Sequence, residues 1–148
     1  MVKRIFLGSD HAGFEMKDRI KEHLEGRGIQ VRDLGTNGPD SVDYPDLAHA
    51  VADSVVNEQG SLGIVLCGSG NGVNMAANKH AGVRGALAWE PGIAALAREH
   101  NNANVLSIPA RYITTETAFA IVDAFLGAAF EGGRHQRRVE KIEFRLKS

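Results

Sequence analysis

The sequence has one cysteine, no long apolar run and almost no net charge, and each shortage excludes a class of protein. A single cysteine in 148 residues cannot form an internal disulfide or supply a cysteine-based zinc site. No stretch approaches the roughly 18 apolar residues of a membrane span, and the apolar opening that ends at Leu7 is too short for a secretion signal. A formal net charge of −1 gives no field that would attract nucleic acid or a membrane surface. We therefore expect a soluble cytoplasmic protein with neither kind of partner.

The chain is long enough for one hydrophobic core, so we expect a single domain over residues 1–148. Short apolar runs at 4–8, 29–34, 62–67, 83–89 and 104–108 predict five strands. Apolar residues spaced four apart between those runs predict helices, and Val139, Ile142 and Leu146 predict a last helix at the C-terminus. This alternation predicts an α/β fold: a three-layer α/β/α sandwich around a five-stranded parallel, Rossmann-like sheet.

The most informative segment is the glycine-rich turn after the third expected strand. The run Gly63-Ile-Val-Leu-Cys67 delivers the only cysteine onto Gly68-Ser-Gly-Asn-Gly72, and a helix-prone segment follows. In parallel sheets the ligand crevice lies at the carboxyl ends of the strands. Backbone N–H groups and the positive end of a helix at such a turn favour an anion and stabilise a thiolate. The segment therefore predicts a base beside an oxyanion site.

Plainer interpretations of this segment stay open. Glycines often serve only a tight connection, and an intracellular cysteine is most often a small buried apolar residue. The turn is not a Walker loop, because no Gly-Lys-Ser/Thr follows it. A dinucleotide site is a closer competitor, with Glu90 at a suitable distance downstream, but Val73 stands where that fingerprint has its third glycine.

Two histidines lie near the expected ends of elements. His11 follows Asp10 after the first strand, and His100 lies in the polar run Glu99-His-Asn-Asn102. Histidine titrates near neutral pH, so together with a thiol these residues form an acid–base set. A lone histidine is nevertheless more often a capping or surface residue.

The C-terminal segment is basic. From residue 134 to residue 147 there are six basic residues and two acidic ones. Arg134 and Arg138 are four apart, share one face of the expected helix and follow Gly132-Gly133. A solvated basic face is the default explanation, but arginine forks also suit phosphate, and Arg111 after the fifth strand would add to that charge.

With these residues laid out, the chain resembles the type B ribose-5-phosphate isomerases, a family that includes galactose-6-phosphate and allose-6-phosphate isomerases. The resemblance covers nearly the whole length. Its carriers are Ser9-Asp-His-Ala-Gly13, Asp43-Tyr-Pro45, Cys67-Gly-Ser-Gly-Asn-Gly72, Ala76-Ala-Asn-Lys79, His100-Asn101, Ala103-Asn-Val105 and Gly132-Gly-Arg-His-Gln-Arg-Arg-Val139.

The resemblance implies an aldose–ketose isomerase that works through a cis-enediolate, without a metal or a nucleotide cofactor. Cys67 would be the base that moves a proton between C1 and C2, Ser69 would assist it, and His100 would open the furanose ring. The remaining implied contacts are to substrate: Asp10 and Tyr44 at the sugar oxygens, Asn101 with Gly68, Gly70, Asn71 and Gly72 at the enediolate, and His11, Arg111, Arg134 and Arg138 at the phosphate. In the family some basic residues reach the site from a second subunit, which implies a homodimer and leaves room for a tetramer.

One departure bears on the base. A subgroup with a similar loop has glycine at the cysteine position and a glutamate after the loop as base, whereas this chain has Cys67 and Val73. The cysteine mechanism is therefore the consistent one. Ribose 5-phosphate with ribulose 5-phosphate is the expected pair. Alternatives are allose 6-phosphate, galactose 6-phosphate or a tetrose phosphate, a non-catalytic sensor of a phosphorylated ligand, and a dinucleotide-binding protein.

Overall fold

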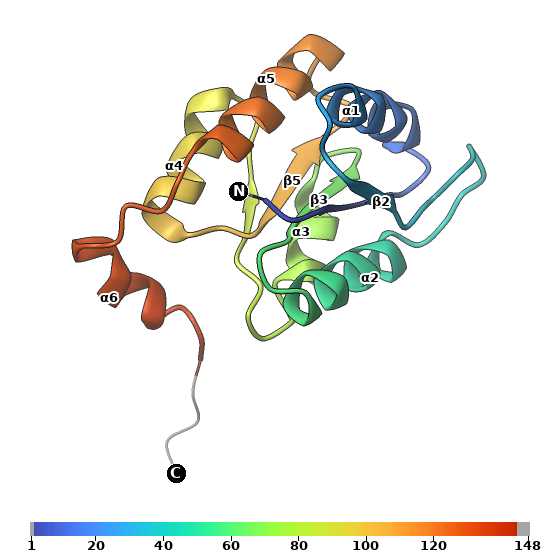
Figure 1. Cartoon of the computed structure of the whole chain (residues 1–148). Coiled ribbons are helices and arrows are strands. Elements are labelled where there is room, and N and C mark those ends of the chain that lie inside the picture. Colours follow the sequence, from blue (N-terminus) through green and yellow to red (C-terminus); the bar gives the residue numbers. More distant parts are fainter. Residues whose placement is uncertain (1, 145–148) are drawn as a thin grey trace.

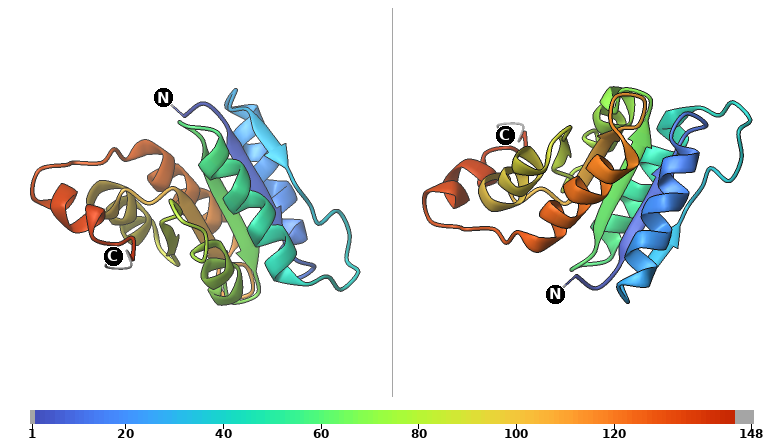
Figure 2. Two further views of the ribbon diagram at one scale, coloured as in Figure 1. Left: turned by 90° about the horizontal axis from the view of Figure 1, so that it is seen from below. Right: turned by 90° about the horizontal axis from the view of Figure 1, so that it is seen from above.

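Five parallel strands form the middle layer of the molecule, and helices cover both faces (Figures 1 and 2). The computed structural model describes residues 2–144. Its elements are β1 (Ile5–Ser9), α1 (Phe14–Gly26), β2 (Val31–Asp33), α2 (Tyr44–Asn57), β3 (Leu62–Cys67), α3 (Asn71–Ala77), β4 (Gly85–Leu87), α4 (Pro91–Asn101), β5 (Val105–Pro109), α5 (Thr115–Gly127) and α6 (Arg134–Glu140). The strand order β2-β1-β3-β5-β4 confirms the predicted α/β/α sandwich with a five-stranded parallel sheet.

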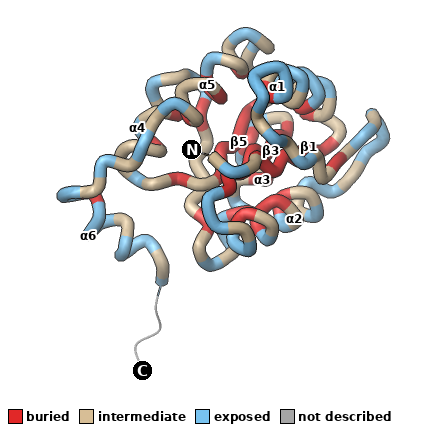
Figure 3. The backbone as a smooth tube through the Cα atoms, viewed as in Figure 1, coloured by how far each residue is buried: buried red, intermediate tan, exposed pale blue. Residues whose placement is uncertain are grey.

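Alternation along the central strands divides the core into two clusters. Ile64 and Leu66 of β3 face the cluster shared with α1, α4 and α5. Val65 and Cys67 face the opposite cluster, shared with α2 and α3. Successive strand residues point to opposite faces, so this division follows from the sequence of β3 itself. Figure 3 shows the buried residues concentrated in the strands and α6 largely exposed.

The strand order reverses between β1 and β3. From β1 the chain adds β2 on one side, then crosses back to place β3 on the other side of β1. Ligands of open α/β sheets bind at such a switch point, beyond the carboxyl ends of the two strands. Here those ends are Ser9 and Cys67, and Ser9 is paired in register with Leu66.

The observed boundaries agree best with the predicted ones in the interior of the sheet. The strand Leu62–Cys67 has the predicted limits, whereas β2 and β4 have three residues each because they are edge strands that pair on one side only. The C-terminal helix is shorter than its apolar spacing predicts. It ends at Glu140 with a tight final turn, and Ile142 is half exposed. Leu146 lies outside the described residues.

Among the described residues no helix combines the length and apolar character that crossing a bilayer requires.

Candidate active site

The turn after β3 is tied to the end of β5 by backbone hydrogen bonds. Cys67, the last residue of β3, is buried, and its carbonyl accepts a hydrogen bond from the Ala110 N–H at 2.9 Å. The Gly68 carbonyl accepts from the Arg111 N–H at 3.0 Å. The side chain of Arg111 lies over Gly68, since a Cβ added at Gly68 would be 3.2 Å from its Cδ and 3.3 Å from Nη1. The thiol and a guanidinium therefore flank the same turn.

Gly70 and Gly72 let the turn pack more closely than other residues would. Gly70 has φ +77°, and a Cβ there would come within 2.6 Å of a Leu87 methyl group. The Gly70 carbonyl accepts a buried hydrogen bond from the Ser107 hydroxyl at 2.6 Å. At Gly72 an added Cβ would lie 2.5 Å from the ring of Tyr44. The glycines thus fix the path of the turn and seat the Tyr44 ring against it.

Ser69 and Asn71 form a local hydrogen-bonded pair at the exposed tip of the turn. The Ser69 Oγ accepts from the Asn71 backbone N–H at 3.3 Å and from its side-chain Nδ2 at 3.2 Å. Because the oxygen already accepts twice, the Ser69 hydroxyl hydrogen is free to be donated to a bound oxygen.

The neighbouring turn after β1 presents a carboxylate and an imidazole. Asp10 is buried, and its Oδ1 accepts from the Ala12 N–H at 3.0 Å and the Gly13 N–H at 3.2 Å. These bonds fix the carboxylate and leave Oδ2 for a ligand. The Val42 N–H donates to His11 Nδ1 at 3.3 Å. A neutral His11 ring therefore carries its proton on Nε2, where it can be donated to an anion.

The fold brings most of the expected site residues to this carboxyl edge of the sheet but not all of them. His100 and Asn101 end α4, which starts just beyond the carboxyl end of β4 and runs back towards the amino ends of the strands. Strand β5 follows α4 and runs from the amino edge to the carboxyl edge of the sheet. It ends at Pro109, which is paired with Cys67. Five residues of strand span ~16 Å. His100 and Cys67 of one chain therefore lie at opposite edges of the sheet.

Arg134 and Arg138 belong to the same amino-edge group. Both are exposed on α6, which contacts the rest of the described chain mainly through α4. Figures 1 and 2 show α6 beyond α4, away from the sheet. The expected phosphate ligands therefore divide between the two edges, with His11 and Arg111 at the carboxyl edge.

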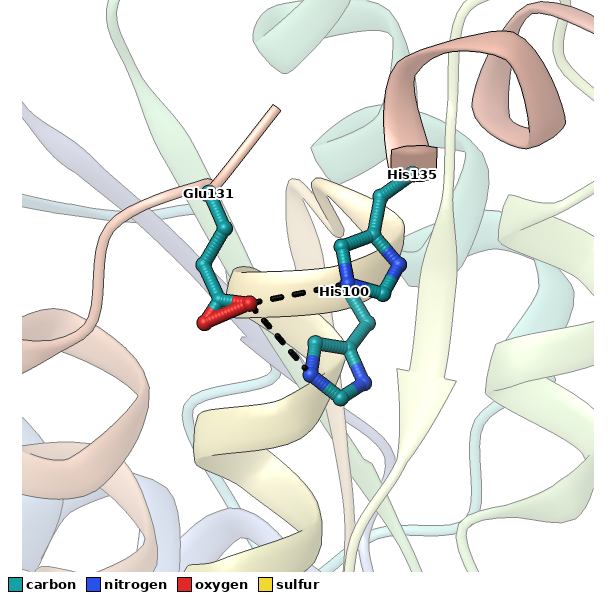
Figure 4. A group of neighbouring side chains, drawn as sticks. All are labelled: His100, Glu131 and His135. Atoms are coloured by element: carbon teal, nitrogen blue, oxygen red, sulfur yellow. Dashed lines mark ion pairs between the residues drawn. The ribbon is translucent and has the colours of Figure 1, made fainter. Parts of the chain in front are cut away.

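His100 is stacked on His135, with ring centroids 4.2 Å apart and planes inclined by 12° (Figure 4). Glu131 faces both rings: its Oε1 lies 3.6 Å from His100 Nε2 and 3.5 Å from His135 Nε2. Burial lowers the pKa of His135 below its usual range, and the charges of His100, Arg134 and Arg138 lower it further, while Glu131 raises it. The neutral form of His135 is thereby favoured.

Two sets of residues near the site were not predicted from the sequence. Lys17 is completely buried on α1 and pairs with Asp33 of β2 at 2.5 Å, while the other oxygen of Asp33 accepts from the Gly35 N–H. This pair holds the start of the loop that continues to Val42, the partner of His11. Lys17 was missed because a charged residue does not contribute to the apolar periodicity from which a buried helix face is predicted. Glu131 and His135 were missed because their partner His100 is far away in the chain.

Comparison with known proteins gives one consistent family. A family model described as Ribose/Galactose Isomerase matches residues 5–142. Ribose-5-phosphate isomerase B of Escherichia coli is 48% identical over 141 residues, which cover 95% of each chain. A ribose 5-phosphate isomerase structure from Thermotoga maritima superimposes with a TM-score of 0.92 at 51% identity, covering 94% of this chain and 96% of that one. The Mycoplasma genitalium enzyme with bound ribulose-5-phosphate gives 0.91 at 52% identity, covering 94% and 93%.

Proposed function

Because the chain belongs to the ribose/galactose isomerase family, we propose that it is an aldose–ketose isomerase that interconverts ribose 5-phosphate and ribulose 5-phosphate. The observation that carries the proposal is the position of Cys67, the last residue of a central strand, beside the glycine-rich turn that leads into α3 at the switch point of the sheet. The names of the relatives and the bound ribulose-5-phosphate of one of them support the substrate. Residues 1–148 would form one isomerase domain that works in the cytoplasm, as expected for a metabolic enzyme.

In the chemical step Cys67 acts as the base. The thiolate removes the proton from C2 of the open-chain aldose, the C1 oxygen takes up a proton, and a cis-enediol(ate) forms. The cysteine then returns its proton to C1 as the C2 hydroxyl loses one, which yields the ketose. Negative charge on the enediolate oxygens would be stabilised by N–H groups of Gly68 to Gly72 and by the free hydroxyl hydrogen of Ser69. Val73 offers no alternative carboxylate.

The sugar and its phosphate need further contacts on both sides. The free Oδ2 of Asp10 and the Tyr44 hydroxyl would bind sugar hydroxyl groups, and His100 would open the furanose ring by moving a proton between the ring oxygen and O1. Asn101 would bind the enediolate beside it. The phosphate would lie among four cationic or N–H-donating side chains: His11, Arg111, Arg134 and Arg138.

This assignment requires a second copy of the chain. The base and the ring-opening histidine lie at opposite edges of one sheet, so one substrate can reach both only if the amino edge of another subunit meets the carboxyl edge of the first. A two-fold dimer would form two such sites. Large apolar side chains are exposed near both edges, namely Trp89 and Tyr112 at one and Ile142 and Phe144 at the other, which supports an interface. Pairs of dimers forming a tetramer would be compatible with this arrangement.

The direct test is an assay of the purified chain. We expect turnover of ribose 5-phosphate in the absence of added metal or nucleotide, with a higher kcat/KM than for allose 6-phosphate, galactose 6-phosphate or erythrose 4-phosphate. A higher kcat/KM for one of the other sugars would reassign the substrate. Binding of ribose 5-phosphate without any turnover would instead indicate a sensor.

A further inference from the structure

The side chains around His100 form a compact set of metal-ligating atoms. One ligand atom from each of His100, Glu131 and His135 lies within 4.8 Å of the other two; His100 ends α4, Glu131 lies in the loop between α5 and α6, and His135 belongs to α6 (Figure 4). Backbone hydrogen bonds hold the set in place. The Glu131 N–H donates to the Glu99 carbonyl at 2.9 Å, and the His135 N–H donates to the Gly132 carbonyl at 3.0 Å.

The spacing of these atoms suits a metal ion better than it suits direct hydrogen bonds. The Glu131 oxygen is 3.6 Å from one ring nitrogen and 3.5 Å from the other, beyond the usual N–H···O range of about 2.7–3.2 Å. Ligand atoms at ~2.0–2.1 Å from a tetrahedral Zn²⁺ are ~3.3 Å from one another. The two separations from Glu131 are therefore close to those between zinc ligands. The rings themselves are stacked 4.2 Å apart with planes inclined by 12°, so metal binding would turn them until both nitrogens point at one ion.

A second observation concerns His135 alone. Its side chain is 9% exposed, and its Nε2 is buried without a hydrogen-bond partner among the described residues. A buried polar atom without a partner costs free energy. This nitrogen faces the Glu131 oxygen, on the side where an ion bound by the three residues would lie.

We propose that His100, Glu131 and His135 bind a divalent transition-metal ion, for which Zn²⁺ is the best fit. Two imidazoles and one carboxylate are a known zinc ligand set that leaves a fourth position for water. Bound zinc occupies the Nε2 atom of His100 and so inhibits the isomerase. The inhibitory part rests on the proposed function, while the binding site itself does not.

The test is calorimetric titration of the chelator-treated full chain with ZnCl₂, with Co²⁺ absorption as a second readout of four-coordinate binding. We expect one Zn²⁺ per chain. Glu131→Gln and His135→Gln should each weaken binding by more than the roughly 10–100-fold that loss of an outer-shell partner costs. Circular dichroism checks that both variants fold.

Two control variants test whether other potential ligands hold the metal. His80 belongs to a separate cluster in which both its ring nitrogens are engaged, by His49 at 2.7 Å and Asp53 at 3.1 Å. His80→Gln and Cys67→Ser should bind zinc as the wild type does. Loss of binding in either control with retention in Glu131→Gln, or no binding by the wild type, overturns the site.

Activity measured in parallel separates the two proposals. Zinc should inhibit wild-type isomerisation at concentrations that leave Glu131→Gln and His135→Gln at their metal-free rates. Full activity of zinc-loaded wild type would overturn the inhibitory part. If the metal-free wild type is inactive, the proposed function fails, yet zinc binding that depends on Glu131 and His135 still supports the site.

Discussion

The turn after β3 is held by backbone hydrogen bonds to the end of β5 and by close packing at its glycines, whereas the basic residues of α6 lie on a short helix that contacts the rest of the described chain mainly through α4. At the first region a Cβ added at Gly70 or Gly72 would come within 2.6 Å of a neighbouring side chain. At the second, Arg134 and Arg138 are exposed. In our proposal one chain contributes a rigid half-site at its carboxyl edge and a more exposed half-site at its amino edge.

The difference matches the division of labour that the proposed shared site requires. The carboxyl edge would carry the groups that must be placed accurately beside the reacting atoms, and rigid backbone does this well. The amino edge would supply charge and a proton-transfer imidazole from helix ends. In our account each region is completed by the opposite region of a second subunit.

The largest expected effect is that of removing the base from the rigid half. Cys67→Ala should lower kcat by about 10²–10⁴-fold, because proton transfer is lost and no carboxylate replaces it. KM should change little, since the phosphate contacts remain. Steady-state kinetics on ribose 5-phosphate measures this, with thermal unfolding to show that the core packing of Cys67 is not the cause. A variant that keeps most of the wild-type kcat would remove Cys67 from the mechanism.

A smaller and more selective effect is expected at the other half. His100→Asn should reduce conversion of ribose 5-phosphate by about 10²-fold, the low end for a lost acid–base group. It should leave deuterium exchange at C1 of the acyclic ribulose 5-phosphate within about tenfold of wild type, because exchange needs only Cys67. Nuclear magnetic resonance follows both processes. Equal losses of exchange and conversion would contradict a role confined to ring opening.

Loss of a phosphate contact should act mainly on KM. If Arg138 binds the phosphate as proposed, Arg138→Ala removes a charged hydrogen bond worth about 1.5–3 kcal/mol, so KM should rise roughly 10–100-fold. Arg32→Ala, which removes an exposed arginine from the edge strand β2, controls for general electrostatics and should leave KM unchanged. An equal rise in both variants would mean that Arg138 acts only through the overall charge.

The smallest effect concerns the packing of the turn. Gly72→Ala places a Cβ 2.5 Å from the Tyr44 ring and should destabilise the protein by about 1–3 kcal/mol, as overpacking does. A Cβ at Gly127, by contrast, meets nothing within 4 Å, so Gly127→Ala is the matched control. Chemical denaturation compares the two. If Gly72→Ala is no less stable than Gly127→Ala, the turn is looser than its contacts indicate.

The features that could be predicted from the sequence are the local ones, such as the turn after β3, and not those that depend on how distant segments are arranged. The strand Leu62–Cys67 and its turn were predicted because a short apolar run and closely spaced glycines are local signals. The separation of His100 from Cys67 follows from strand order and helix direction, which no local pattern contains. The C-terminal apolar spacing predicted a helix beyond Glu140, yet Ile142 is half exposed, so little burial was available there to extend the helix. The Lys17–Asp33 ion pair could not be predicted from the sequence, because it depends on how β2 is placed relative to β1 and α1.

The most direct test of the shared site is to mix two defective proteins. In a two-fold dimer of Cys67→Ala with Arg138→Ala, one of the two sites combines an intact carboxyl edge with an intact amino edge. After subunit exchange, verified by mass spectrometry of the mixed dimer, an equimolar mixture assayed below the wild-type KM should recover about one quarter of wild-type activity. A mixture that exchanges subunits fully and stays as inactive as its components would contradict the shared site.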